Sequence, residues 1–427
     1  MPDLTQAYLP ILQGHRLPGL DLGEGLIYPH YAGYSILNIP PSLCRWMEVP
    51  DYGTQPLRVA ELDSLAKGVR RIIFILMDAL GLQLFQGWME KALLPVWQNL
   101  LQDGLLAPLT SLSPSTTSSA LTSLWCGRSP AEHGIIGYEL WLKEYGVVAN
   151  MILHAPITYR NDTGSLAKAG FQAETYLPFT NLGTHLGAHG VKPYAFQHTS
   201  ILRSGLSQML YKDVETRSFN TSTDLWLNLR DLVNGRPAER QFIWVYWGEV
   251  DHYSHQYGPE DERPAAEFAT FSQTFEKLLL KQLRSDVRHD TLLILTADHG
   301  QISTIQSPHH DLRNHPNLVQ RLHILPTGEN RFQYLFVRPG QTEAIQEYYQ
   351  HSWPRQFTLI DPSRAVQAGL FGPGKPHPQL FDRLGDTLAL AQGSAYLWWA
   401  NKDNPLLGRH GGLSPEEMLV PFLMARL

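Results

Sequence analysis

The chain has 427 residues, 43% of them hydrophobic, so it can bury a large core, and we predict one large α/β domain carrying a smaller insert. A formal net charge of −6 argues against a stable nucleic-acid complex, and two cysteines, Cys44 and Cys126, are too few for a disulfide framework or a thiolate metal cage. Because no apolar run is long enough to span a bilayer and the first residues lack a secretory pattern, we expect a cytoplasmic protein without a membrane partner.

The first predicted buried strand ends in a carboxylate. Residues 1–65 are rich in Pro, Gly and Tyr, and we expect them to wrap around the core. Residues 72–77 then form a continuous apolar run, which is typical of a buried parallel strand, and Asp78 follows it. Ligands of open α/β sheets bind at the carboxyl ends of the strands. Asp78 is therefore either part of such a site or the N-cap of the next helix.

A run of hydroxyl residues precedes the next predicted helix. Residues 113–134 read SPSTTSSALTSLWCGRSPAEHG, with a helix-compatible stretch that breaks at Gly127. The free N–H groups and the dipole of a helix N-terminus favour an anion. A hydroxyl among Ser115, Thr116 and Thr117 can cap this helix, bind a phosphate or attack one. Residues 138–180 show no clear periodicity, and we expect them to be irregular.

Two further apolar runs also end in polar side chains. Residues 242–247 lead into Asp251 and His255, whose spacing places both on one side of a helical turn. The third run, 291–297, ends directly at Asp298 and His299. Since the carboxyl ends of parallel strands lie at one edge of a sheet, we expect these side chains and Asp78 to converge. Carboxylates and imidazoles together favour Zn²⁺, with Mn²⁺ or Fe²⁺ as alternatives.

The last third of the chain divides into an insert and a return to the core. We assign residues 321–384 to a small α/β insert over the sheet edge, and residues 66–320 and 385–427 to the catalytic core. His410 lies in a glycine-flanked loop before the last core strand and is a natural further ligand. Ser414, followed by Pro415 and then by Glu417, predicts a helix start.

Taken together, these motifs resemble the alkaline phosphatase superfamily and, within it, the type I phosphodiesterase/nucleotide pyrophosphatase branch. The resemblance covers about residues 70–427 and rests on Asp78, PSTT ending at Thr117, SPAEHG, Asp251 with His255, Asp298-His299-Gly300 and His410-Gly411-Gly412. It implies a three-layer α/β/α core with a mostly parallel sheet. It also implies two metal ions, with Asp251, His255 and His410 at one and Asp78, Asp298, His299 and the Thr117 oxygen at the other. Thr117 would be the nucleophile of a phosphothreonine mechanism, with Thr116 and Ser115 as alternatives.

The expected substrate contacts depart from the branch at one position. An Asn that contacts phosphate in these enzymes is replaced here by Tyr138, which can also donate a hydrogen bond. Trp247 and Arg331 are further candidate contacts, with core packing and a solvated surface as their respective alternatives. His309 and His310, near the insert, are weaker candidates.

The sequence thus predicts hydrolysis of a small phosphate ester, most readily a phosphodiester or nucleotide pyrophosphate. A phosphomonoesterase or phosphonate hydrolase using the same residues is the alternative, and a non-catalytic metal-binding protein is a remote one. The motifs leave the oligomeric state open.

Overall fold

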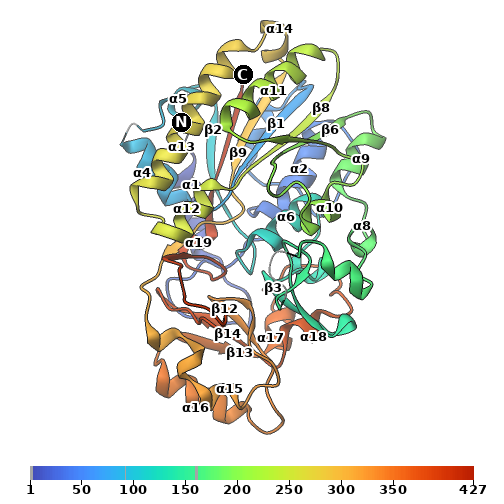
Figure 1. Cartoon of the computed structure of the whole chain (residues 1–427). Helices are drawn as coiled ribbons and strands as arrows, with labels where there is room; N and C mark the ends of the chain where they lie inside the picture. Colours follow the sequence, from blue (N-terminus) through green and yellow to red (C-terminus); the bar gives the residue numbers. More distant parts are fainter. Residues whose placement is uncertain (1–2, 92, 159–161) are drawn as a thin grey trace.

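The computed structural model describes residues 3–91, 93–158 and 162–427, and two seven-stranded sheets dominate it (Figure 1). The first sheet has the order β2-β16-β9-β1-β8-β6-β7. Its strands are β1 (Arg71–Met77), β2 (Leu105–Thr110), β6 (Lys192–His198), β7 (Glu215–Phe219), β8 (Gln241–Trp247), β9 (Thr291–Thr296) and β16 (Leu419–Arg426). β16 pairs antiparallel with β2 and β9, and the other described pairs in this sheet are parallel. The predicted mostly parallel sheet is therefore confirmed.

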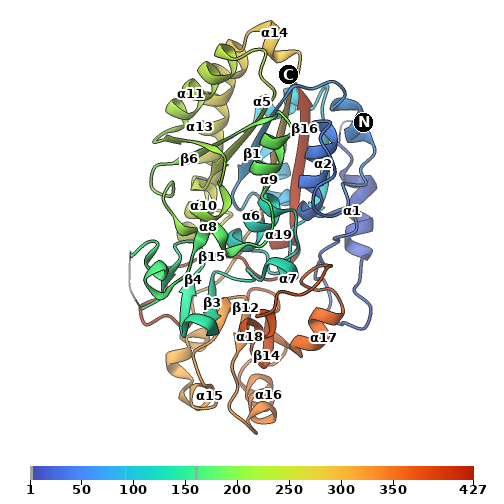
Figure 2. The ribbon, with the colours of Figure 1, turned by 90° about the vertical axis from the view of Figure 1, so that its right-hand side faces the viewer.

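Helices cover both faces of this sheet because the strands are apolar on both. Phe242 and Trp244 of β8 contact Trp125 of α6 (Thr117–Cys126). Trp247 of the same strand lies on the opposite face, where it contacts Phe271 of α13 (Glu262–Leu278). Figure 2 shows α13 and α11 (Ser222–Gly235) on one side of the sheet and α2 (Ile39–Trp46) on the other. The core thus has the three layers that the sequence predicted.

The second sheet is antiparallel, with the order β13-β14-β12-β11-β3-β4-β5. Its strands are β3 (Glu139–Leu142), β4 (Val147–Asn150), β5 (Ala155–Pro156), β11 (Thr327–Glu329), β12 (Phe332–Leu335), β13 (Phe357–Ile360) and β14 (Thr387–Ala391). The residues expected to be irregular after 138 in fact supply three of these strands, which are too short to show a periodicity in sequence. The sheet also extends beyond residues 321–384, since β14 and β3 to β5 lie outside that range.

Helices and short elements complete the second half of the molecule. The helices α15 (Pro316–Val319), α16 (Thr342–Ser352), α17 (Pro362–Gln367) and α18 (Leu380–Leu384) accompany the second sheet, and Ile345, Tyr349 and Trp353 form a hydrophobic cluster of their own with its strands. A two-stranded ribbon joins β10 (Ile302–Ser303) to β15 (Gly408–Arg409) between the sheets. α19 (Pro415–Met418) begins with the predicted capping box of Ser414 and Glu417.

The N-terminal segment lies along the β2 edge of the first sheet. Bridges join Asp3 to Leu106 and Ser35 to Thr110, and α1 (Thr5–Gly14) packs against β2. Tyr31 reaches the other half of the molecule, where its hydroxyl donates to the carbonyl of Leu370 at 2.9 Å. This segment therefore contacts both halves. Within the residues described, no helix has the length and apolar character needed to cross a membrane.

Candidate metal centre and nucleophile

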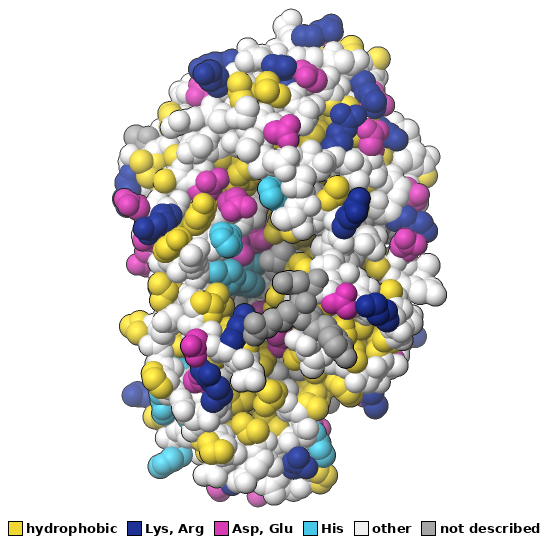
Figure 3. Space-filling view, in the orientation of Figure 1, with side chains coloured by type: hydrophobic (Ala, Val, Ile, Leu, Met, Phe, Trp, Pro, Cys, Tyr) yellow, Lys and Arg dark blue, Asp and Glu magenta, His cyan; other side chains and the backbone are white. Residues whose placement is uncertain are grey.

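The carboxyl ends of three central strands bring the predicted acidic residues together. Asp78 follows β1, and Asp298 follows β9, the neighbouring strand. Asp251 lies on α12 (Glu249–Tyr257), which begins two residues after β8 on the other side of β1. Figure 3 shows acidic and histidine side chains gathered in a hollow of this face. The strand order of the sheet thus accounts for the convergence that the sequence predicted.

Two overlapping groups of side chains have the geometry to hold a cation. Asp78, Asp298 and His299 form one, and Asp251, His299 and His410 form the other, with the ligand atoms of each group within 4.8 Å of one another. His299 therefore belongs to both groups, whereas the resemblance placed it at one ion only. The remaining predicted ligand, His255, lies beside Asp251, with 3.4 Å between Nε2 and Oδ1.

The three imidazoles are oriented by backbone carbonyls. Nδ1 of His255 lies 2.8 Å from the Gly408 oxygen, Nδ1 of His410 lies 2.9 Å from the Ser115 oxygen, and Nδ1 of His299 lies 3.1 Å from the Gly300 oxygen. A carbonyl only accepts, so each Nδ1 carries the proton and each Nε2 is left as an acceptor. This arrangement is common among metal-bound histidines, where the outer hydrogen bond fixes the tautomer. Burial and the neighbouring His299 and His255 hold the pKa of His410 well below its usual range, which keeps the ring neutral.

The buried carboxylates fit a bound cation. Asp78 and Asp298 are buried, and Asp78 Oδ1 and Asp298 Oδ2 have no hydrogen-bond partner within the described residues. Burial, and after it the charges of Asp298 and Asp251, raise the pKa of Asp78 well above its usual range. Such a cluster of like charges is costly unless a cation neutralises it. The donor set of carboxylates and neutral imidazoles suits a divalent metal.

Thr117 is the first residue of α6 and faces this centre. Its Oγ1 lies 3.1 Å from Nε2 of His299. Thr116, the preceding residue, makes no side-chain cap hydrogen bond, so its hydroxyl does not occupy the N-terminus of the helix. Ser115, by contrast, is engaged with the His410 loop: its Oγ donates to the Gly412 carbonyl at 2.7 Å. Ser115 contacts His410 only through its backbone carbonyl, so of the three side-chain hydroxyls that of Thr117 is the one hydrogen-bonded to a candidate ligand.

The sequence did not single out Tyr246 and Glu329, which the structure adds to this region. Tyr246, the penultimate residue of β8, donates its hydroxyl proton to Asp78 Oδ2. In the sequence Tyr246 is one of several aromatic residues in an apolar strand. The only signal that separates it from the others is its position in the alternation of side chains between the two faces of β8. Glu329 is 8% exposed, and its Oε1 accepts from the N–H of Tyr138 at 2.7 Å.

The candidate substrate contacts are dispersed. Arg331 is fully buried, and its guanidinium forms a bidentate ion pair with Glu417, at 2.7 and 2.9 Å, besides donating to the Ala395 carbonyl. It is neither a solvated surface residue nor free to face a phosphate. Trp247 stacks on Phe219 in the core, with ring centroids 5.5 Å apart. Tyr138 is 43% exposed at the start of the second sheet.

The two weaker histidine candidates are occupied by protein groups. His309 Nε2 lies 2.8 Å from the Ser352 carbonyl, and His310 Nε2 lies 2.7 Å from Gln356 Oε1. These contacts tie the turn before the second sheet to α16 and the residues after it. They give the two side chains a structural role away from the candidate metal groups.

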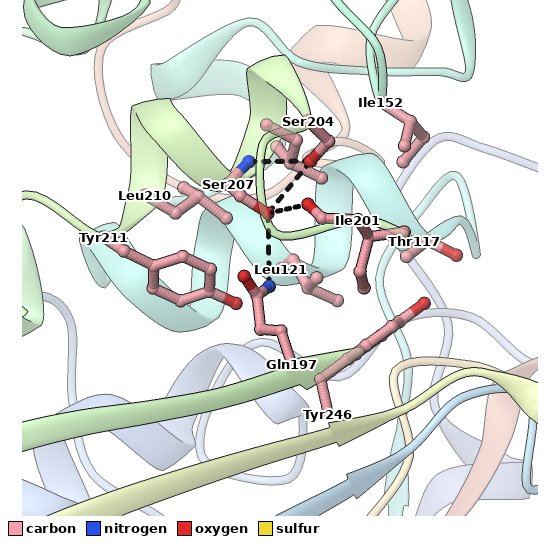
Figure 4. Close-up of a pocket in the computed structure, with 11 residues that line it drawn as sticks. Thr117, Leu121, Ile152, Gln197, Ile201, Ser204, Ser207, Leu210, Tyr211 and Tyr246 are labelled. Atoms are coloured by element: carbon pink, nitrogen blue, oxygen red, sulfur yellow. Dashed lines mark hydrogen bonds between the residues drawn. The ribbon is translucent and has the colours of Figure 1, made fainter. Parts of the chain in front are cut away.

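A small pocket adjoins Thr117 and Tyr246 (Figure 4). Its cavity volume is about 40 Å³, and none of its 11 described lining residues is charged. Thr117, Leu121, Ile152, Ile201 and Tyr246 are among them. Gln197 Nε2 and the hydroxyls of Ser204 and Ser207 are hydrogen-bonded to one another or to the backbone, whereas Gln197 Oε1 and the Tyr211 hydroxyl have no partner within the described residues. The pocket therefore suits an uncharged part of a ligand better than a second anionic group.

A mostly parallel α/β core with paired metal-type side chains and a hydroxyl at its carboxyl edge defines a hydrolase-like architecture of the alkaline phosphatase type. The chain belongs to the type I phosphodiesterase / nucleotide pyrophosphatase family, whose model matches residues 72–358. This family and the similar solved structures support phosphoester hydrolysis. No curated protein matches the sequence of the chain.

Solved structures with the same fold include two ectonucleotide pyrophosphatase / phosphodiesterases and a phosphonoacetate hydrolase. Murine ectonucleotide pyrophosphatase / phosphodiesterase 5 is 16% identical with a TM-score of 0.60, over 83% of this chain and 87% of that one. Phosphonoacetate hydrolase from Sinorhizobium meliloti 1021, in complex with phosphonoformate, is 16% identical with a TM-score of 0.58, over 84% and 91%. Human ectonucleotide pyrophosphatase / phosphodiesterase 5 is 14% identical with a TM-score of 0.60, over 83% and 87%. At these identities the likeness shows the fold.

Proposed function

We propose that this protein is a two-metal phosphodiesterase that cleaves small phosphodiesters or nucleotide pyrophosphates through a phosphothreonine on Thr117. The observation that carries the proposal is the position of Thr117 Oγ1, at an uncapped helix start and 3.1 Å from His299. His299 is shared by both groups of candidate ligands, so the hydroxyl lies beside two sites at once. Two divalent ions, with zinc favoured by the imidazoles, would lower the pKa of this hydroxyl and stabilise charge on phosphate oxygens.

The protein's own groups account for binding and attack. The N-terminus of α6 binds a phosphate oxygen through its free N–H groups, which orients phosphorus toward Thr117 Oγ1. Attack forms the bond from Thr117 oxygen to phosphorus and breaks the bond to the leaving alcohol or phosphate. Water then cleaves the phosphothreonine and restores the hydroxyl. Asp78, Asp298, Asp251 and the three histidines would hold the ions.

Uncharged surroundings favour a diester over a monoester. A diester carries one negative charge and two organic groups, whereas a monoester carries nearly two charges. The pocket beside Thr117 has apolar walls and no charged lining residue among those described. It suits an ester group rather than a second phosphate charge. A phosphomonoesterase or phosphonate hydrolase remains the second candidate, because a structural neighbour is a phosphonoacetate hydrolase in complex with phosphonoacetate.

The test compares kcat/KM for bis-p-nitrophenyl phosphate and p-nitrophenyl phosphate on zinc-loaded protein. Thr117→Ala is expected to lower turnover of both by at least about 10³-fold, because the nucleophile is lost, while both metal sites stay filled. Thr122→Ala, on the same helix with its hydroxyl bonded to the Ser118 carbonyl, is the matched control and should remain active. A wild-type ratio above one supports the diesterase. A ratio below one selects the monoesterase, and full activity of Thr117→Ala rejects the nucleophile.

A further inference from the structure

The second sheet places a buried carboxyl at the start of the nucleophile helix. Glu329 ends β11, and its Oε1 accepts from the Tyr138 N–H at 2.7 Å. Gly137, the residue before Tyr138, accepts a hydrogen bond from the hydroxyl of Ser118 in the first turn of α6, at 2.9 Å. The loop that carries Tyr138 thus links this carboxyl to the helix that begins at Thr117.

The side chain of Glu329 also packs against the His410 loop. A Cβ on Gly411 would lie 2.4 Å from the Cβ of Glu329 and 2.6 Å from its Cγ, so only glycine fits there. Two residues further on, Arg331 pairs with Glu417, which in turn accepts from the Gly412 N–H at 2.8 Å. The position of the Glu329 carboxyl is therefore fixed from both sides.

A carboxylate in this position opposes the charge of a bound phosphate. The N-terminus of a helix stabilises an anion near its first turn. A negatively charged side chain at the same place competes with a bound anion for this stabilisation and repels it. The described residues that line the pocket beside Thr117 include no Lys or Arg to offset it. The electrostatic repulsion between this carboxylate and the phosphate is larger for a phosphate with two negative charges than for one with a single charge.

We propose, on the basis of the diesterase function above, that Glu329 sets the preference of this site for singly charged phosphodiesters over doubly charged monoesters. When the carboxyl is ionised, it raises the free energy of the bound dianion more than that of the monoanion. When it is protonated or replaced by an amide, this discrimination falls. Glu329 acts as a specificity residue and takes no part in bond making.

The carboxyl changes its charge in an accessible pH range. Burial raises the pKa of Glu329 to about 8, the Thr116 hydroxyl and the hydrogen bond from the Tyr138 N–H oppose the rise, and the charges of Glu139 and Asp251 add to it. These are the groups that face it from the helix start, from the Tyr138 loop with β3, and from α12. At pH 7 Glu329 is therefore mostly neutral, and above pH 9 it is mostly ionised.

The experiment follows the ratio of kcat/KM for bis-p-nitrophenyl phosphate to that for p-nitrophenyl phosphate between pH 7 and 9.5. Both substrates keep their charge over this range, because the second pKa of a phosphate monoester is about 6. Comparison with Glu329→Gln separates the effect of Glu329 from titration of the metal ligands, which both proteins share. For the wild-type protein the ratio should rise about tenfold, the size expected for one extra charge near the site.

Glu329→Gln should make the ratio flat within about twofold, because the amide oxygen still accepts from the Tyr138 N–H but carries no charge. Glu139→Gln is the matched control: Glu139 lies on β3 opposite Gly328, and its Oε2 accepts from Trp399 Nε1 at 2.8 Å. This control should keep a rise of the ratio, displaced to lower pH because the charge of Glu139 contributes to the raised pKa of Glu329. A flat wild-type ratio, or the same change in both variants, overturns the inference even if Glu329→Gln folds poorly.

The two proposals fail in different ways. Hydrolysis of the diester that depends on Thr117, together with a flat wild-type ratio, leaves the diesterase intact and rejects the role of Glu329. Hydrolysis of neither substrate by zinc-loaded protein rejects both proposals.

Discussion

The orientation of single side chains distinguishes this centre from a chance cluster of acids and histidines. Asp78 illustrates this, because one of its oxygens accepts from the Tyr246 hydroxyl while the other has no partner among the described residues. The phenol thus fixes the carboxylate with its free oxygen beside His299, 3.5 Å from Nε2. Hydrogen bonds of this kind orient metal ligands and are as much a part of a site as the ligands.

Tyr246→Phe should therefore weaken zinc binding about 10- to 100-fold, since Asp78 loses its orienting donor but stays in place. The measurement is a zinc titration against a competing chelator. Tyr211→Phe serves as the control: Tyr211 lines the pocket beside Thr117, with its ring against Trp125 and away from the carboxylates. Equal zinc affinity of the two variants would remove Tyr246 from this role.

At the level of elements, β11 and the residues after it join the second sheet to the loops of the core. Arg331 is fully buried, and Glu417, its partner at the start of α19, also accepts from the Gly412 and Ser414 N–H groups. This ion pair fixes the loop between His410 and β16. A buried pair broken on one side leaves an uncompensated charge.

Arg331→Met should lower the free energy of unfolding by about 3–5 kcal/mol, because Glu417 then remains buried without its partner. Chemical denaturation measures the change. Arg338→Met, at an exposed arginine just after the same sheet, should stay within about 0.5 kcal/mol of wild type. A large loss of substrate affinity in a fully stable Arg331→Met protein would instead restore Arg331 as a phosphate contact.

The elements also show which features could be predicted from the sequence. β1, β8 and β9 are long apolar runs, each followed within a few residues by a carboxylate, so local patterns were sufficient to bring Asp78, Asp251 and Asp298 to one edge. The strands β3 to β5 are too short for a periodicity. Glu329 and Arg331 lie in one tetrapeptide, GENR. Only tertiary contacts reveal that Glu329 accepts from the N–H of Tyr138 and that Arg331 pairs with Glu417.

At the scale of the whole molecule, the metal centre couples stability to pH. In the metal-free fold the raised pKa of Asp78 means that the folded chain retains a proton that the unfolded chain, with a pKa of about 3.9, has released. The contribution of Asp78 to stability therefore falls as the pH rises from about 4 toward the folded pKa. A bound cation replaces that proton, so the metal-loaded protein does not lose this stability.

The difference in Tm between zinc-loaded and chelator-treated protein should accordingly widen from pH 5.5 to pH 8. Binding at 1,000 times the dissociation constant stabilises a fold by about 4 kcal/mol, which calorimetry resolves. The lowered pKa of His410 acts in the opposite direction: below about pH 6.5 the unfolded chain takes up a proton that the fold excludes. The zinc-loaded and the chelator-treated proteins both lose this stability at low pH, so His410 does not contribute to the difference between their Tm values. Asp78→Asn should remove the widening, and a pH-independent difference in the wild-type protein would show that Asp78 is not a metal ligand.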